Sequence, residues 1–331
     1  MWKLIETARS FEPRSALLTV LNFIFLAVIW FVVIPNMFTF RTFMRGSLVT
    51  LVVIFVSFIL LHPYVPDKTL LAGWNKAPSW MFAHPNGAGM FALSIFLSAC
   101  GMIAARRKRH ELFAAWAVIV AAGIVLVVTR SRTSELSALV FVAAFTLVMI
   151  FLRLLRSRRV QVRGIGYLLV TGLVGSFLYG IHAWLSGLTE RALDVLLSNR
   201  LTIWGAILES IPGPHGWVLG VGMLPAGVNT LFSTQYAGGF GIDGTYVDVL
   251  YTEGVVGLIL FVATMLLIGV FCTARPLERR LRAIGLGLVA TAMASSSTET
   301  HFWLVASPLS FVVLGGCSVL LAQRGRVECP N

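Results

Sequence analysis

Long apolar runs constrain this chain more than any other feature of its sequence. Nine runs are long enough to cross roughly 30 Å of hydrocarbon, and they lie at about 16–34, 46–61, 87–105, 112–129, 134–152, 164–185, 254–273, 283–298 and 303–322. Backbone polar groups in lipid need partners within the protein, so such runs form helices or a closed barrel. Barrel strands are about 9–11 residues long and alternate in polarity, whereas these runs are longer and apolar all round. The sequence therefore predicts an all-α polytopic integral membrane protein with about nine spans.

The composition agrees with this class. Of the 331 residues, 57% are hydrophobic and 12% are charged, whereas a soluble domain has about 25% charged residues. Residues 1–331 are treated as one membrane domain. The first run begins near Ala16 and is long enough to span, so we expect a retained helix and no cleaved signal peptide. The four cysteines form no CxxC pair, so neither a disulfide framework nor a zinc site is predicted.

Basic residues indicate how the spans are oriented. Clusters such as Arg106–Arg109 and Arg153–Arg163 follow alternate runs, and the positive-inside rule places them in the cytoplasm. The net charge of +12 therefore reflects topology and gives no indication of nucleic-acid binding. The outer face then receives the 62–86 loop, the Thr129–Thr133 turn, the large 186–253 loop and the Ser295–Phe302 turn. Either the N-terminus is external despite its basic residues, or the run boundaries near residues 34–46 differ from those given.

Arginines on the predicted outer face are candidates for anion binding. Arg130 and Arg132 lie in the turn after the fourth run, where guanidinium groups could grip phosphate oxygens bidentately. The alternative is two side chains that reach the interface from a helix end. Arg200 lies among apolar residues spaced by three and four, which predicts an interfacial amphipathic helix. Its alternative is a solvated arginine or one that faces lipid headgroups.

Acidic and imidazole groups on the same face are candidates for proton transfer. Asp243 is a candidate general base, because a carboxylate near apolar and aromatic neighbours suits that role. Its alternative is a turn residue or a helix cap, as it is for Asp248 and Glu253. The outer histidines are His84, His215 and His301. No two histidines have metal-ligand spacing, so no metal site is predicted.

Four stretches, taken together, point to a family. They are His84-Pro85-Asn86, Ser131-Arg132-Thr133-Ser134, Arg200 and Trp204 followed by Gly220-Val221-Gly222, and Thr245-Tyr246-Val247-Asp248 through Glu253-Gly254-Val255-Val256-Gly257. Their order and their placement relative to the spans resemble the bacterial O-antigen ligase and Wzy-type polysaccharide polymerase superfamily. The resemblance covers roughly residues 80–275.

The resemblance implies a GT-C-like helical bundle with one large periplasmic loop, in the bacterial inner membrane. It implies a metal-independent, inverting glycosyltransferase that needs no cofactor. Its donor would be an undecaprenyl-diphosphate-linked oligosaccharide, and a flippase and a chain-length regulator are candidate partners. Arg132 and Arg200 would contact the diphosphate as catalytic residues, with Arg130 in support. The other residues that we expect to bind substrate are Trp204, Tyr246, Glu253, His84 and His301.

One position departs from the family. Asp243 and Gly244 stand where ligases of the superfamily usually carry His-Asn. Asp243 is thus the first candidate for the base, with His301 or Glu299 as alternatives. The Ser-Arg-Thr-Ser form is more like that of exopolysaccharide polymerases, so polymerisation of lipid-linked repeat units is the preferred function. A ligase that transfers glycan to lipid A-core or protein is the alternative, and a transporter of a lipid-linked anion is the second.

Overall fold

The structure, a computed structural model, describes residues 21, 24–61, 85–105, 109–156, 189, 200–222, 244–273, 277–297, 299 and 307–328. Of these residues 91% lie in helices, and none lies in a β-strand. Contacts divide the chain into two units. Met1–Asn22 and Thr146–Ala263 form what we call the loop unit, and Phe23–Phe145 and Thr264–Asn331 form the bundle unit.

Five helices in the described part of the chain are long and apolar enough to cross a membrane. They are Phe40–Leu61 (α4), Asn86–Ala104 within Pro85–Ala104 (α5), Arg109–Thr129 (α6), Arg132–Arg153 within Arg132–Arg156 (α7) and Thr245–Thr273 (α13). Each overlaps one predicted run, which supports an all-helical membrane protein. Helices Ile24–Met37, Arg279–Ser296 (α14) and Pro308–Glu328 (α16) lie at the first, eighth and ninth runs. The run at 164–185 lies outside the described residues.

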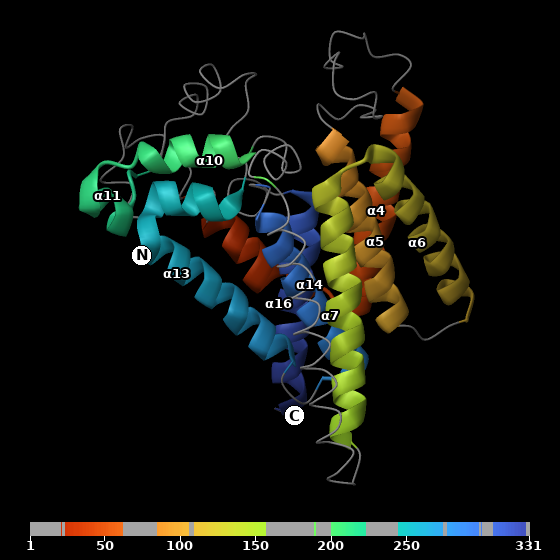
Figure 1. Ribbon diagram of the computed structural model, residues 1–331. Coiled ribbons are helices and arrows are strands. Elements are labelled where there is room, and N and C mark those ends of the chain that lie inside the picture. The colour runs from red at the N-terminus through yellow and green to blue at the C-terminus, as the bar shows by residue number, and fades with distance from the viewer. Residues whose placement is uncertain are drawn as a thin grey trace. The chain divides into compact units, whose positions relative to one another are not determined.

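Helix α5 lies at the centre of the bundle unit. In its most apolar stretch 72% of the residues are buried, against 11–28% in the other four candidate spans. It packs against α4, α6, α14 and α16, and Figure 1 shows α4, α5 and α6 side by side. The largest fully buried side chains of this unit include Met44, Leu93, Leu97, Leu288, Leu309 and Leu320. Burial of these side chains supplies the apolar contacts that hold the helices together.

The predicted boundary between the first two runs is wrong. The first helix continues to Met37 through a π-helical turn, Ile29–Val33 (η1), and α4 begins at Phe40, six residues before the predicted start. Thr39 and Thr42 explain that start, because the backbone N–H of each bonds the hydroxyl of the other in a reciprocal cap. Arg41 and Arg45, predicted in a connector, therefore lie in the first two turns of α4.

Helix α13 also begins earlier than predicted, at Thr245 and not at residue 254. Gly254, with φ 69° and ψ −170°, interrupts it and divides it into two halves. The half from Gly254 to Thr273 matches the predicted run, and at 1.5 Å per residue it is about 30 Å long, the thickness of the hydrocarbon core. The half from Thr245 to Glu253 belongs to the predicted 186–253 loop, whose described parts also form Arg200–Glu209 (α10) and Gly213–Leu219 (α11).

In the loop unit α10 packs on the first half of α13. Ile207 and Ile211 form a buried cluster with Tyr251, and Ile203 and Val247 extend it by one turn. Figure 1 shows α10 running alongside this half of α13, with α11 at the bend. The backbone N–H groups of Val221 and Gly222 donate to the carbonyls of Tyr251 and Thr252, at 2.9 Å and 3.0 Å. These bonds fix the segment after α11 to the end of the first half of α13.

Candidate functional site

A buried carboxylate lies at one end of the bundle unit. Glu299 is 6% exposed, and its Oε1 accepts a hydrogen bond of 2.8 Å from Asn86 Nδ2. Thr133 Oγ1 donates to the same oxygen over a longer 3.4 Å. We call these three residues the Glu299 cluster. A buried carboxylate is unfavourable unless polar groups replace its water, and here those groups come from the first turns of α5 and α7.

The close contact between these helix starts depends on one small residue. A Cβ atom on Gly89 of α5 would collide with the Ser131 side chain and would lie 2.9 Å from Ser134 Oγ. The hydroxyls of Ser131 and Ser134 are themselves 2.9 Å apart. Arg130, just before them, has φ 51°, in the left-handed region that residues other than glycine rarely adopt. This conformation reverses the chain between α6 and α7, so that Thr133 lies beside Glu299.

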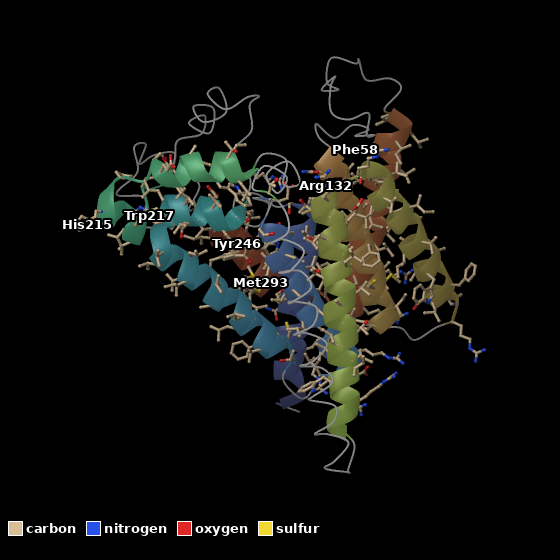
Figure 2. All side chains as sticks on the ribbon, in the orientation of Figure 1. Phe58, Arg132, His215, Trp217, Tyr246 and Met293 are labelled. Carbon is tan, nitrogen blue, oxygen red and sulfur yellow. The ribbon has the colours of Figure 1, made fainter. Side chains whose placement is uncertain are left out.

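Arg130 and Arg132 are both exposed at this end of the bundle unit. Arg132 is the first residue of α7 and precedes Thr133 of the Glu299 cluster; Figure 2 shows it at the upper end of that helix. The first turn of a helix also favours anions, because its backbone N–H groups lack partners within the helix. The bundle unit thus places exposed guanidinium groups next to a buried carboxylate. Diphosphate binding by these arginines stays a prediction.

The opposite end of the bundle unit carries charges of a different kind. Arg41 at the start of α4 forms an ion pair with Glu111 at the start of α6, and His110 beside it is exposed. In the described parts of the five candidate spans, charged side chains lie in the first two turns, in the last turn or before the break at Gly254. No charge therefore lies near the middle of these described spans, where transporters commonly bind their substrates.

The loop unit buries three charged side chains. Arg200 at the start of α10 is 7% exposed, Asp248 in the first turn of α13 is 6% exposed, and Glu253 at the end of its first half is 2% exposed. The burial of Arg200 argues against the solvated arginine that the sequence left open. Ile203 and Val247 both pack against the buried cluster of Ile207, Ile211 and Tyr251. Arg200 precedes Ile203 by one helical turn, so it lies close to the first turn of α13.

The break in α13 determines where Glu253 lies. A Cβ atom on Gly257 would collide with Glu253 Cβ and lie 2.9 Å from its Oε2, so the carboxylate lies over the next turn. That turn begins the second half of α13, where a negative charge is favoured by the N-terminal N–H groups. Gly254 has a positive φ, and a Cβ atom at this position would collide with the carbonyl of Val218. The carboxylate therefore lies at the boundary between the two halves.

Two aromatic residues complete the predicted set in the loop unit. Trp204 is half-buried on α10, four residues after Arg200 and on the same helix face. Tyr246 is half-buried in the first turn of α13, and its ring meets that of Phe261 edge-on at a centroid distance of 5.8 Å. Because Phe261 lies beyond Gly254, this contact joins the two halves of α13. Figure 2 shows Tyr246 on the first half.

The predicted site residues thus fall into three groups. Arg130 and Arg132 lie together in the bundle unit. The loop unit holds Arg200, Trp204, Tyr246 and Glu253. The other three predicted residues, Asp243, His84 and His301, lie outside the described residues. An approach of Arg132 to Arg200 would join the two units and stays a prediction.

The bond between Asn86 and Glu299 was not predicted. The two residues are 213 positions apart. Asn86 precedes one apolar run and Glu299 follows another, and many polar residues occupy such positions. The sequence points to Asn86 only through its motif and to Glu299 only as an alternative base. Their shared position at the predicted outer ends of apolar runs was the one available signal, and it does not specify a partner.

No site for a metal ion is formed by three or more His, Cys, Asp or Glu side chains within the described part of the chain. No known protein-family model matches the sequence, and no curated protein matches it either.

Proposed function

We propose that this protein is a periplasmic-face glycosyltransferase that polymerises undecaprenyl-diphosphate-linked glycan repeat units. It would act in the bacterial inner membrane, as a GT-C-like bundle of about nine spans. The observation that carries the proposal is the Glu299 cluster beside exposed Arg132, at one end of an apolar helical bundle. A carboxylate and a guanidinium at the membrane surface suit a reaction in which a proton leaves one substrate and a diphosphate leaves the other.

The proposed reaction needs two protein groups. The hydroxyl oxygen of the acceptor sugar attacks the anomeric carbon, and the bond from that carbon to the diphosphate oxygen breaks with inversion. The proton of the hydroxyl passes to a carboxylate, either Asp243 or Glu299. The diphosphate leaves with the bonding electrons, and Arg132 and Arg200 stabilise the charge that develops on it.

The position of the charges supports surface chemistry in preference to transport. A transporter of a lipid-linked anion would need polar groups that its substrate meets on the way across the membrane. In the described spans the charged groups lie in the first two turns, in the last turn or before the break at Gly254. Transfer to lipid A-core or protein would use the same groups and differs from polymerisation only in the acceptor.

Replacement of Arg132 tests the anion-binding role. The assay is extension of a defined lipid-diphosphate oligosaccharide by the purified protein in proteoliposomes, with product length read on gels. We expect Arg132→Ala to lower the extension rate by roughly 10²–10³-fold, the usual loss when one donor to a developing negative charge is removed. Arg153→Ala is the matched control, because Arg153 is an exposed arginine near the other end of the same helix. It should extend chains at the wild-type rate.

Two outcomes would count against the proposal. If the folded wild-type protein extends no chains with any lipid-diphosphate donor offered, a glycosyltransferase is excluded for those donors and the transporter gains support. If folded Arg132→Ala keeps the wild-type rate, this arginine does not stabilise the leaving diphosphate.

A second pair of variants identifies the base. Glu299→Gln and Asp243→Asn each replace a carboxylate by an amide of nearly the same size. The variant that removes the base should lose roughly 10²–10⁴-fold in rate, as expected for a general base. Near-normal rates in both variants would exclude a base at either position.

A further inference from the structure

Helix α11 of the loop unit has an apolar side that faces outward. Trp217 is 40% exposed and Val218 is 50% exposed, so two adjacent large apolar side chains lie on the surface here. His215 is exposed as well, but two positions along a helix turn the side chain by about 200°. The histidine therefore lies opposite Trp217, and Val218 lies between the two on the exposed face, about 60° from His215 and about 100° from Trp217 around the helix. Figure 2 shows both His215 and Trp217 on α11.

The apolar side of α11 continues into the outer face of a candidate span. The carbonyl of Val218 packs directly on Gly254, where a side chain would collide with it. From there the second half of α13 exposes Val255 and Ile259, which lie on one helix face, and Leu260 beside them. Such a face on a helix long enough to cross the membrane meets acyl chains. The exposed residues of α11 lie at the end of this lipid-facing surface.

The connection between α11 and the end of the span is a fixed one. Val221 and Gly222, which follow α11, donate hydrogen bonds to the carbonyls of Tyr251 and Thr252. Gly220, with φ 74°, approaches the same backbone so closely that a Cβ atom would collide with Thr252. Movement of α11 away from the bend would break these contacts. The position of α11 is therefore set by the Gly254 bend.

We propose that α11 lies in the membrane–water interface and that its apolar side contacts lipid. Trp217 would lie at the boundary between headgroups and acyl chains, a depth that tryptophan favours because its ring is amphipathic. Val218 would continue the surface of Val255 and Ile259, and His215 would face water. The helix then holds α10 and the first half of α13 at the membrane surface. This inference does not depend on the proposed enzymatic activity.

Quenching of tryptophan fluorescence tests the contact with lipid. The full chain is reconstituted in phosphatidylcholine vesicles, with and without bromine on the acyl chains, and wild type is compared with Trp217→Phe. We expect the substitution to remove emission that brominated lipid quenches. Trp116→Phe is the lipid-facing reference, because Trp116 is exposed on α6, and Trp30→Phe is the buried reference. If Trp217→Phe behaves like Trp30→Phe, Trp217 does not contact lipid and the proposal is wrong.

A second measurement places α11 in depth. Nitroxide labels are attached to His215→Cys, Trp217→Cys and Ile259→Cys in a chain whose natural cysteines are alanine, and collision with oxygen and with a water-soluble nickel complex is compared. We expect the label at 215 to favour nickel, the label at 259 to favour oxygen, and the label at 217 to lie between them. A label at 217 that matches 215 would overturn the proposal. So would strong spin–spin broadening at 217, which indicates a second copy of the chain on this face.

Discussion

At the residue scale, Glu299 is the most informative side chain in the described structure. Its carboxylate is buried, and Asn86 replaces part of its lost hydration through a 2.8 Å hydrogen bond. Such a bond to a charged group contributes more than a neutral one, because the acceptor attracts the donor more strongly. The same bond holds the start of α5 to the segment after α14. Asn86 therefore contributes to the fold and also orients a candidate catalytic group.

Removal of the Asn86 amide should destabilise the protein. We expect Asn86→Ala to lower the free energy of unfolding by about 1–3 kcal/mol, since the carboxylate then stays buried without one donor. Asn36→Ala is the matched control, because Asn36 makes a hydrogen bond of the same length, 2.8 Å, on an exposed surface. Its effect should stay within about 0.5 kcal/mol. Thermal unfolding in detergent measures both, and equal effects would contradict a stabilising role for the Glu299 bond.

At the element scale, the break at Gly254 divides α13 into two halves of different character. Its second half is apolar and long enough to span, whereas its first half carries Asp248 and Glu253. A continuous straight helix would keep both halves on one axis. The positive φ of Gly254 changes the direction of the chain, and the carbonyls of Tyr251 and Thr252 accept bonds from the segment after α11. The bend thus satisfies backbone groups near a helix terminus without water.

Gly254→Ala should be strongly destabilising. The alanine would need a positive φ and its Cβ atom would collide with Val218, so we expect a loss of about 1–3 kcal/mol or more. Gly205→Ala is the control from the same unit, because Gly205 lies in α10 with open space around it. That change should stabilise the protein by about 0.5–1 kcal/mol, through the better helix propensity of alanine. The order of the two midpoints of thermal unfolding tests the bend; a Gly254→Ala variant as stable as wild type would rule it out.

At the scale of the whole molecule, charge separates two kinds of helix end. One end of the bundle unit carries the ion pair of Arg41 and Glu111. Glu111 lies at the start of α6, which directly follows the basic run Arg106–Arg109 in the sequence. The other end carries the Glu299 cluster and exposed Arg132. The positive-inside rule assigns the first end to the cytoplasm. The site proposed for catalysis would then face the periplasm.

Cysteine labelling of two histidine positions tests this orientation. His110 and His215 are both exposed. The proposed topology would place His110 in the cytoplasm and His215 outside. In a background without natural cysteines, we expect a membrane-impermeant maleimide to label His215→Cys in intact spheroplasts. His110→Cys should react only after the membrane is permeabilised. The reverse labelling pattern would show that the protein has the opposite orientation in the membrane, with the proposed site on the cytoplasmic face.

Particular residues show how far the sequence could predict the site. Arg132, Arg200 and Glu253 were identified because they lie on the predicted outer face and in stretches that resemble the superfamily. Their burial was not predictable, since Arg132 is exposed whereas Arg200 is buried, although each directly follows a polar residue, Ser131 and Asn199. The helical start at Thr245 was missed for a related reason. Asp248 and Glu253 made that stretch look like a loop, and only packing against Ile207 and Ile211 makes it a stable helix.

The sequence by itself determined the all-helical class and the approximate position of the five described candidate spans. It could do so because membrane insertion depends on the length and polarity of a local segment, which any window of the sequence contains. Only the tertiary structure decided that α5 is central, that α13 bends at Gly254 and that Asn86 meets Glu299. Each of these depends on close packing between segments far apart in the chain. Many apolar or hydroxyl side chains would satisfy the local pattern equally well, so the choice among them is made by shape and hydrogen bonding in the folded protein.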